Sequence, residues 1–65
     1  MNGVIFTYDS KTLTGKIFDN RKQLMFDFHK QHIVNKDIEP QMGMQCSFQV
    51  DDDCRIKTVF LDTTT

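Results

Sequence analysis

Residues 43–50 read GMQCSFQV, and this stretch decides the fold more clearly than any other. Apolar residues at positions 44, 46, 48 and 50 alternate with polar residues at positions 45, 47 and 49. A period of two places all the apolar side chains on one face of a β-strand. The acidic run at 51–53 then ends the pattern. We therefore predict a strand at residues 44–50 with its apolar face buried.

Similar stretches separated by turn-like polar runs recur along the chain, which favours short strands over helices. Residues 30–43 lose the period of two and contain the only proline, so we predict an irregular crossing with one helical turn around residues 32–35. Gly15, inside a predicted strand, indicates a bulge or a close approach of backbone. The predicted strands cover residues 3–8, 13–18, 24–29, 44–50 and 55–61.

Five short strands expose much apolar surface unless the sheet closes on itself. A long link before the fourth strand and short links elsewhere fit the five-stranded Greek-key barrel called the OB-fold. We therefore predict an all-β fold, an antiparallel five-stranded barrel in one domain over residues 1–65, with a flexible tail at 61–65. The predicted core consists of Ile5, Ile17, Leu24, Phe26, Cys46, Phe48 and Val50.

Length and composition limit the remaining possibilities. A chain of 65 residues allows one domain and buries only about 60% of its unfolded surface. No apolar run approaches the roughly 18 residues of a membrane helix, so we expect no membrane partner. The start of the chain does not have the pattern of a secretory signal, which predicts a cytoplasmic protein. In that compartment Cys46 and Cys54 are expected to be free thiols.

Three stretches carry a family resemblance: LTGKI at residues 13–17, LMFDF at 24–28 and GMQCSFQV at 43–50. They are similar to the glycine-aromatic-glycine-aromatic-isoleucine strand, the valine-aromatic-valine-histidine-phenylalanine strand and the glycine-glutamine-x-valine-x-phenylalanine run of the bacterial cold-shock domain. The chain resembles that family over residues 3–61. The resemblance implies an OB-fold that binds single-stranded nucleic acid by stacking bases on aromatic side chains.

The chain departs from the family where the family stacks bases. Thr14 and Lys16 stand in place of two aromatic residues, and Thr7 stands in place of a tryptophan. Met25 replaces a further aromatic residue and Asp27 replaces the histidine. Losing two or three stacking platforms costs about 4 kcal/mol, on the order of a thousandfold in affinity. Any binding is therefore expected to be weak.

The first function that this resemblance implies is binding of single-stranded RNA or DNA, of an RNA-chaperone or regulatory type. Aromatic side chains would stack bases, methionine would add an apolar contact, and lysines would contact phosphates. The alternative role of the aromatic residues is packing in the core. The alternative for Lys16 is that it simply solvates a face that has lost its binding role. The candidate binding residues are Phe6, Tyr8, Lys11, Lys16, Met25 and Phe28.

Charge favours the first half of the chain for an anionic partner. The net charge is −1, but the residues up to Lys36 include six basic and three acidic ones. The second function left open is an OB-fold protein-interaction or accessory domain that has lost nucleic-acid binding. That alternative predicts an apolar patch formed by Phe6, Met25 and Phe28.

Catalytic and metal chemistry find little support in the sequence. His29 and His32 invite a metal site with the two cysteines, but Cys46 has the inward parity of its strand, so a shared tetrahedral site is not expected. Asp27 and His29 lie on one strand face without a nucleophile. We predict that the protein is not an enzyme and has no metal or other cofactor.

Overall fold

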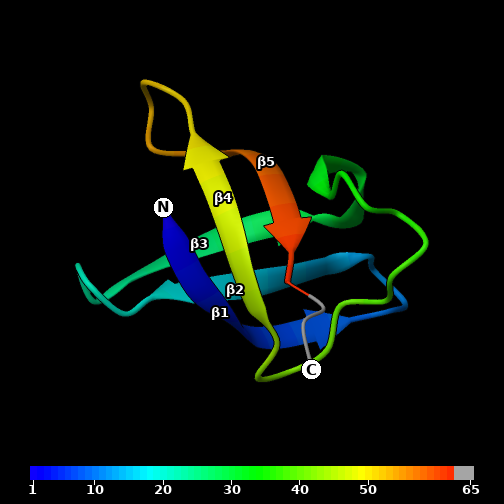
Figure 1. Cartoon of the computed structure of the whole chain (residues 1–65). Coiled ribbons are helices and arrows are strands. Elements are labelled where there is room, and N and C mark those ends of the chain that lie inside the picture. The colour runs from blue at the N-terminus through cyan, green and yellow to red at the C-terminus, as the bar shows by residue number, and fades with distance from the viewer. Residues whose placement is uncertain (63–65) are drawn as a thin grey trace.

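The computed structural model describes residues 1–62 as five strands and one short 3-10 helix (Figure 1). The elements are β1 (Asn2–Asp9), β2 (Thr14–Asp19), β3 (Leu24–His29), η1 (Lys30–His32), β4 (Gln45–Val50) and β5 (Ile56–Leu61). The predicted all-β class is confirmed. The helical turn begins earlier than predicted, because the His29 side chain caps it by accepting a bond from the backbone N–H of Gln31.

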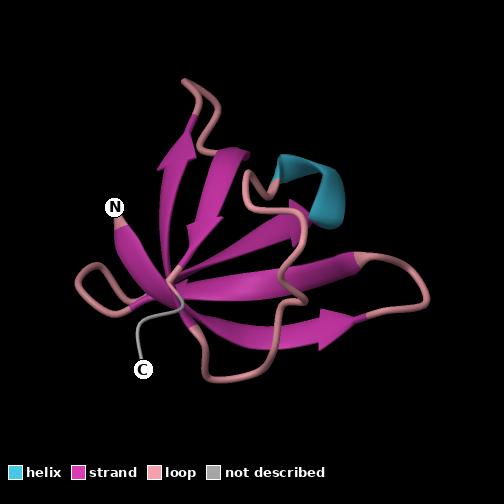
Figure 2. Cartoon of the chain, turned by 45° about the vertical axis from the view of Figure 1, so that its right-hand side comes forward, coloured by secondary structure: helices cyan, strands magenta, loops and turns pink. Residues whose placement is uncertain are grey.

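The five strands form one antiparallel sheet in the order β3-β2-β1-β4-β5. Figure 2 shows that this sheet is strongly curled, so that its strands surround a common interior. The edge strands β3 and β5 contact each other in consequence. The predicted five antiparallel strands are therefore confirmed, in a curled sheet consistent with a small barrel.

The segment after η1 lies along the outer edge of β5. Ile33 forms a parallel bridge with Val59, and the Val34 N–H donates to the Val59 carbonyl at 2.8 Å. Asn35 continues the pairing through its side chain: Nδ2 donates to the Leu61 carbonyl at 2.8 Å and Oδ1 accepts from the Leu61 N–H at 3.0 Å. These bonds satisfy backbone groups that a free sheet edge would expose.

A bulge at Phe6 bends β1. Ile5 lies opposite Ile17 and Thr7 lies opposite Lys16, so Phe6 is the extra residue of β1. Up to this point β1 also pairs with β4, and beyond it β1 pairs with β2 alone. β1 is thus the strand that joins the two parts of the curled sheet.

At Gly15 the neighbouring backbone and side chains approach the chain closely. Gly15 lies opposite Tyr8 on one side and Phe28 on the other, and the two rings stack with centroids 6.0 Å apart and planes 14° apart. A Cβ at Gly15 would meet the Thr7 carbonyl oxygen and come within 2.8 Å of the Phe28 ring. The predicted close approach at Gly15 is therefore confirmed, and the bulge lies at Phe6 instead.

Three turns between strands are built in the same way, each opened by an aspartate whose carboxylate accepts the backbone N–H two residues later. Each turn ends on a non-glycine residue with positive φ. In the third turn the Arg55 N–H also donates to the Asp51 carboxylate, and this bond lowers the pKa of Asp51 below its ordinary value. The opening residues are Asp9, Asp19 and Asp51, and the positive-φ residues are Leu13, Gln23 and Cys54.

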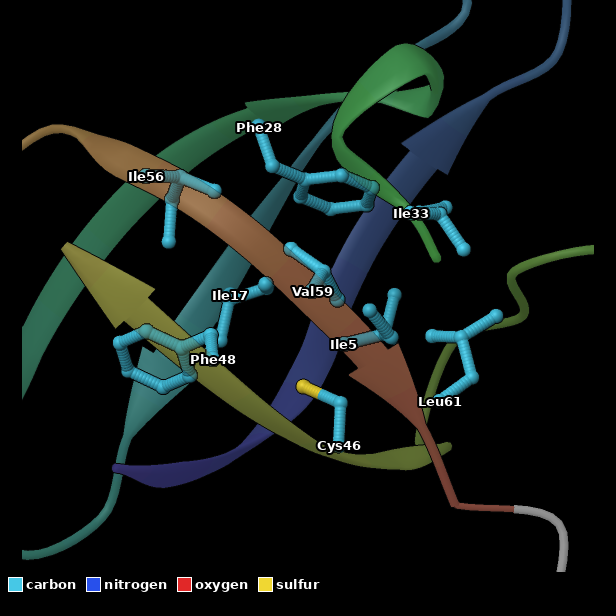
Figure 3. Packing of buried hydrophobic residues seen from close by; sticks show 9 residues of the cluster. All are labelled: Ile5, Ile17, Phe28, Ile33, Cys46, Phe48, Ile56, Val59 and Leu61. Carbon is cyan, nitrogen blue, oxygen red and sulfur yellow. The ribbon is translucent and has the colours of Figure 1, made fainter. Parts of the chain in front are cut away.

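The core is a cluster of nine buried side chains (Figure 3). Phe48 lies at one end of this cluster and packs against Phe26, with ring centroids 5.3 Å apart. Four predicted core residues are confirmed as buried, and Phe26 and Val50 are half-buried against the cluster. The cluster consists of Ile5, Ile17, Phe28, Ile33, Cys46, Phe48, Ile56, Val59 and Leu61.

Two predictions about the ends of elements are wrong. Leu24 is 49% exposed rather than in the core, because it starts β3 directly after a turn and lies opposite Asp19, at the end of the sheet. Leu61 is buried in β5 and the Asp62 N–H donates to the Gln45 carbonyl at 2.9 Å, so the predicted tail does not begin at residue 61. The rest of that predicted tail, 63–65, lies outside the described residues. Within residues 1–62, no helix is long and apolar enough to span a membrane.

Phe48→Ala should lower the free energy of unfolding by about 3–5 kcal/mol, because it leaves a cavity at a side chain that is only 2% exposed. Urea denaturation measures the loss. Phe60→Ala is the matched control: this phenylalanine is 55% exposed on β5, and its removal should change stability by about 0.5 kcal/mol at most. A loss below about 1 kcal/mol at Phe48 would contradict its place in the core.

Both thiols should be free, with very different reactivity. Cys54 is exposed, whereas burial raises the pKa of the Cys46 thiol from its ordinary value of 9.0 to about 11. A thiol reagent at mildly alkaline pH should therefore label Cys54 in the native protein and Cys46 only after unfolding. Labelling of neither cysteine in unfolded, unreduced protein would contradict the prediction.

The same shift in pKa makes stability depend on pH. The folded state favours the protonated Cys46 thiol, so its contribution is fully present below the unfolded pKa of 9.0 and is lost as the pH rises toward about 11. Urea denaturation of wild type and Cys46→Ala across this range should show the loss only in the wild type.

Candidate functional site

The side chains of β1, β2 and β3 that point away from the core form one surface, which we call the outer face. Directly paired residues of neighbouring strands lie on the same face of a sheet. Their pairing arranges this face in three rows, with Phe6 at the bulge between the first and second. The rows are Val4–Phe18–Met25, Thr7–Lys16–Asp27 and Asp9–Thr14–His29.

Three of the predicted binding residues lie together on the outer face. Phe6 is 55% exposed, and Met25 and Lys16 are also exposed. Lys11 lies in the turn that follows β1, where its backbone N–H donates to the Asp9 carboxylate at 2.8 Å. The outer face therefore offers one exposed ring, one flexible apolar side chain and cations in and beside the sheet.

Tyr8 and Phe28 do not project from this surface as exposed rings, although Phe28 lines a groove in it. Phe28 is 3% exposed, so the expectation that it presents a free ring face is wrong. The half-buried Tyr8 packs against the core on the same inner side. Simple alternation from Ile5 would place Tyr8 outside, but the bulge at Phe6 adds one residue and turns Tyr8 inward. Its hydroxyl group is buried with no hydrogen-bond partner within residues 1–62.

Lys16 forms an ion pair across the strands. Its Nζ lies 2.6 Å from Oδ1 of Asp27, the residue directly opposite on β3. The Lys16 side chain is 50% exposed and the Asp27 side chain 80% exposed. A pair this open to water contributes at most about 1 kcal/mol to stability and weakens with salt. The central cation of the outer face is therefore neutralised by a weakly held partner.

His29 and His32 contact each other at the end of β3. The Nδ1 of His29 accepts from the Gln31 N–H at 3.0 Å, and the Nδ1 of His32 accepts from the His29 N–H at 3.2 Å. The rings meet edge to face, with centroids 6.4 Å apart. A neutral imidazole that accepts at Nδ1 carries its proton on Nε2, so both rings offer an Nε2–H donor.

A groove of about 540 Å³ lies beside the ion pair. The sequence did not predict that His29 and His32 line this groove, because their spacing resembled that of metal ligands. His32 returns to the end of β3 only through the turn at η1. Among residues 1–62, no group of three or more histidine, cysteine or acidic side chains is placed to hold a metal ion. The residues that line the groove include Thr7, Thr14, Lys16, Asp27, His29, His32 and the predicted binding residue Phe28.

Cations also flank the outer face at the turns. Lys11 lies in the turn between β1 and β2, and Arg21 and Lys22 lie in the turn between β2 and β3. The Asp9 and Asp19 carboxylates are occupied by backbone N–H groups of these turns. The face thus combines apolar contact surface, hydrogen-bonding groups and a small excess of positive charge.

Comparisons with protein-family models, with curated proteins and with solved structures found no match for this chain. The resemblance to the cold-shock domain thus stays a prediction from the sequence. The functional interpretation rests on the chemistry of the outer face.

Proposed function

We propose that this protein binds single-stranded RNA or DNA weakly through the outer face of β1, β2 and β3. The observation that carries the proposal is the ring of Phe6, which is 55% exposed on the outer face next to Thr7, the residue opposite Lys16. An exposed ring beside a cation is the basic unit of single-strand recognition, because the ring stacks a base while the cation contacts the backbone.

The composition of the outer face sets the strength of this binding. Phe6 supplies one stacking platform, worth about 1–3 kcal/mol per base. Met25 adds an apolar contact, and Lys11 and Lys16 supply phosphate contacts of the kind that any sequence can use. Binding is therefore weak, sensitive to salt and tolerant of sequence, with short pyrimidine-rich strands as the ligands to test first.

We also propose that the curled sheet is an OB-fold of the cold-shock type. The strand order supports this, since β4 follows a long crossing and returns beside β1, as the fourth strand of a Greek key does. The pairing of residues 33–35 with β5 supports closure on the remaining side. In OB-folds, oligonucleotides bind on the face formed by strands two and three, which is part of the outer face here.

A protein-interaction or accessory domain is the second candidate function. The observation in its favour is the ion pair of Lys16 with Asp27, which removes the central positive charge from the outer face. Of the three residues expected in the apolar patch of this alternative, Phe6 and Met25 are exposed and Phe28 is buried.

Phe6→Ala should weaken binding of labelled oligothymidine and oligouridine by about five- to 150-fold, the range that the loss of one stacked base corresponds to. Fluorescence anisotropy at about 0.01 M salt measures the affinity. Phe60→Ala is the control, because it removes an equally exposed ring from β5. Its affinity should equal that of the wild type.

Equal losses in the two variants would contradict stacking at Phe6. Two-dimensional NMR of the wild type with the same oligonucleotides separates the candidate functions. Shifts at Phe6, Lys16 and Met25 support nucleic-acid binding. No shifts with oligonucleotides, combined with shifts at these residues on addition of a protein partner, would favour the accessory-domain alternative.

A further inference from the structure

The Lys16–Asp27 ion pair occupies the place where a phosphate group would meet the outer face. The pair lies in the middle row, next to Phe6 and between the two turns that carry the flanking cations. We propose that Asp27 is an internal competitor of the bound strand: its carboxylate holds Lys16 until a backbone phosphate displaces it. This inference rests on the proposed function and adds the residue that limits its affinity.

The geometry of the pair favours exchange over a permanent bridge. A carboxylate and a phosphate both bind an ammonium group through anionic oxygens, so they compete for the same donor. Asp27 reaches Lys16 with a single contact of 2.6 Å, and both side chains are at least half exposed. An ion pair in water at this exposure is weak enough for a ligand to replace.

Asp27 also differs from the other acidic side chains near this surface. The Asp9 carboxylate accepts the Lys11 N–H, and the buried Asp19 carboxylate accepts two N–H groups, so both are engaged in turns. The Asp27 carboxylate instead accepts its bond from the Lys16 ammonium group. A phosphate at Lys16 would therefore lie next to the Asp27 carboxylate, and the two negative charges would repel each other.

Two consequences follow if the carboxylate is removed. The strand no longer has to displace a competitor or approach a like charge, so it binds more tightly. Lys16 is then free to neutralise a phosphate completely, so binding releases one more counterion than in the wild type, and the dependence of affinity on salt becomes steeper. A substitution that merely altered the fold would not be expected to produce both effects.

The experiment compares Asp27→Asn with Asp52→Asn, since both remove one negative charge. Asp52 is exposed in the turn between β4 and β5 and does not line the groove beside the ion pair, so it controls for net charge. Affinity for labelled oligothymidine is measured by anisotropy between about 0.01 M and 0.15 M salt. We expect Asp27→Asn to bind about five- to thirtyfold more tightly than Asp52→Asn at the lowest salt, with the advantage shrinking as salt increases. The slope of log affinity against log salt should be steeper by about 0.7.

A second pair of variants isolates Lys16. In a Lys16→Ala background, Asp27→Asn should lose most of its advantage over Asp52→Asn, because the cation to be released is absent. Asp27→Ser serves as a second substitution with the same expected gain. Equal affinity of Asp27→Asn and Asp52→Asn would overturn the inference, and the proposed function would stand if the wild type bound and Phe6→Ala weakened that binding. Absence of binding by the wild type and by Asp27→Asn would overturn both.

Discussion

The bulge at Phe6 is the constraint on which the rest of the structure depends. Before the bulge, β1 bonds to β2 on one edge and to β4 on the other, whereas after it β1 has β2 alone. An inserted residue bends a strand and increases its twist, which curls the five strands around one core. The same insertion shifts the alternation of side chains, so Thr7 joins Phe6 on the outer face and Tyr8 turns inward. Shape and surface chemistry therefore have a common origin.

Gly15 makes this inward turn of Tyr8 possible. The tyrosine ring stacks on Phe28, and a Cβ at Gly15 would come within 2.8 Å of that Phe28 ring. Phe28 belongs to the cluster of nine buried apolar side chains found among residues 1–62, and Tyr8 packs against that cluster. A small domain buries little surface, so these two rings are a substantial part of its stabilisation. The aromatic residues that best match the cold-shock motif thus act in packing in this chain.

Much of the fold could be predicted from the sequence, because alternation over four or more residues is a local signal. It located the five strands and four buried residues of the core. A bulge has no comparable signal: nothing in the letters around Phe6 marks an extra residue, so the side of Tyr8 was predicted wrongly. Leu24 has the inward parity but lies at the end of the sheet, and parity does not show where a core ends. The pairing of Lys16 with Asp27 depends on strand register, which required the structure.

The outer face and the core are separated by the pleat of the sheet, and this separation has an energetic consequence. A buried ring such as Phe48 is worth several kcal/mol, close to the whole stability of a small domain, whereas an exposed ion pair is worth at most about 1 kcal/mol. Changes among Phe6, Lys16, Met25 and Asp27 therefore alter what the surface binds at little cost to folding. Under the proposed function one exposed ring supplies the stacking, so phosphate contacts by Lys16 and the cations of the flanking turns make up a large share of the binding. The proposed affinity for an anionic strand then depends on ionic strength more than on base sequence.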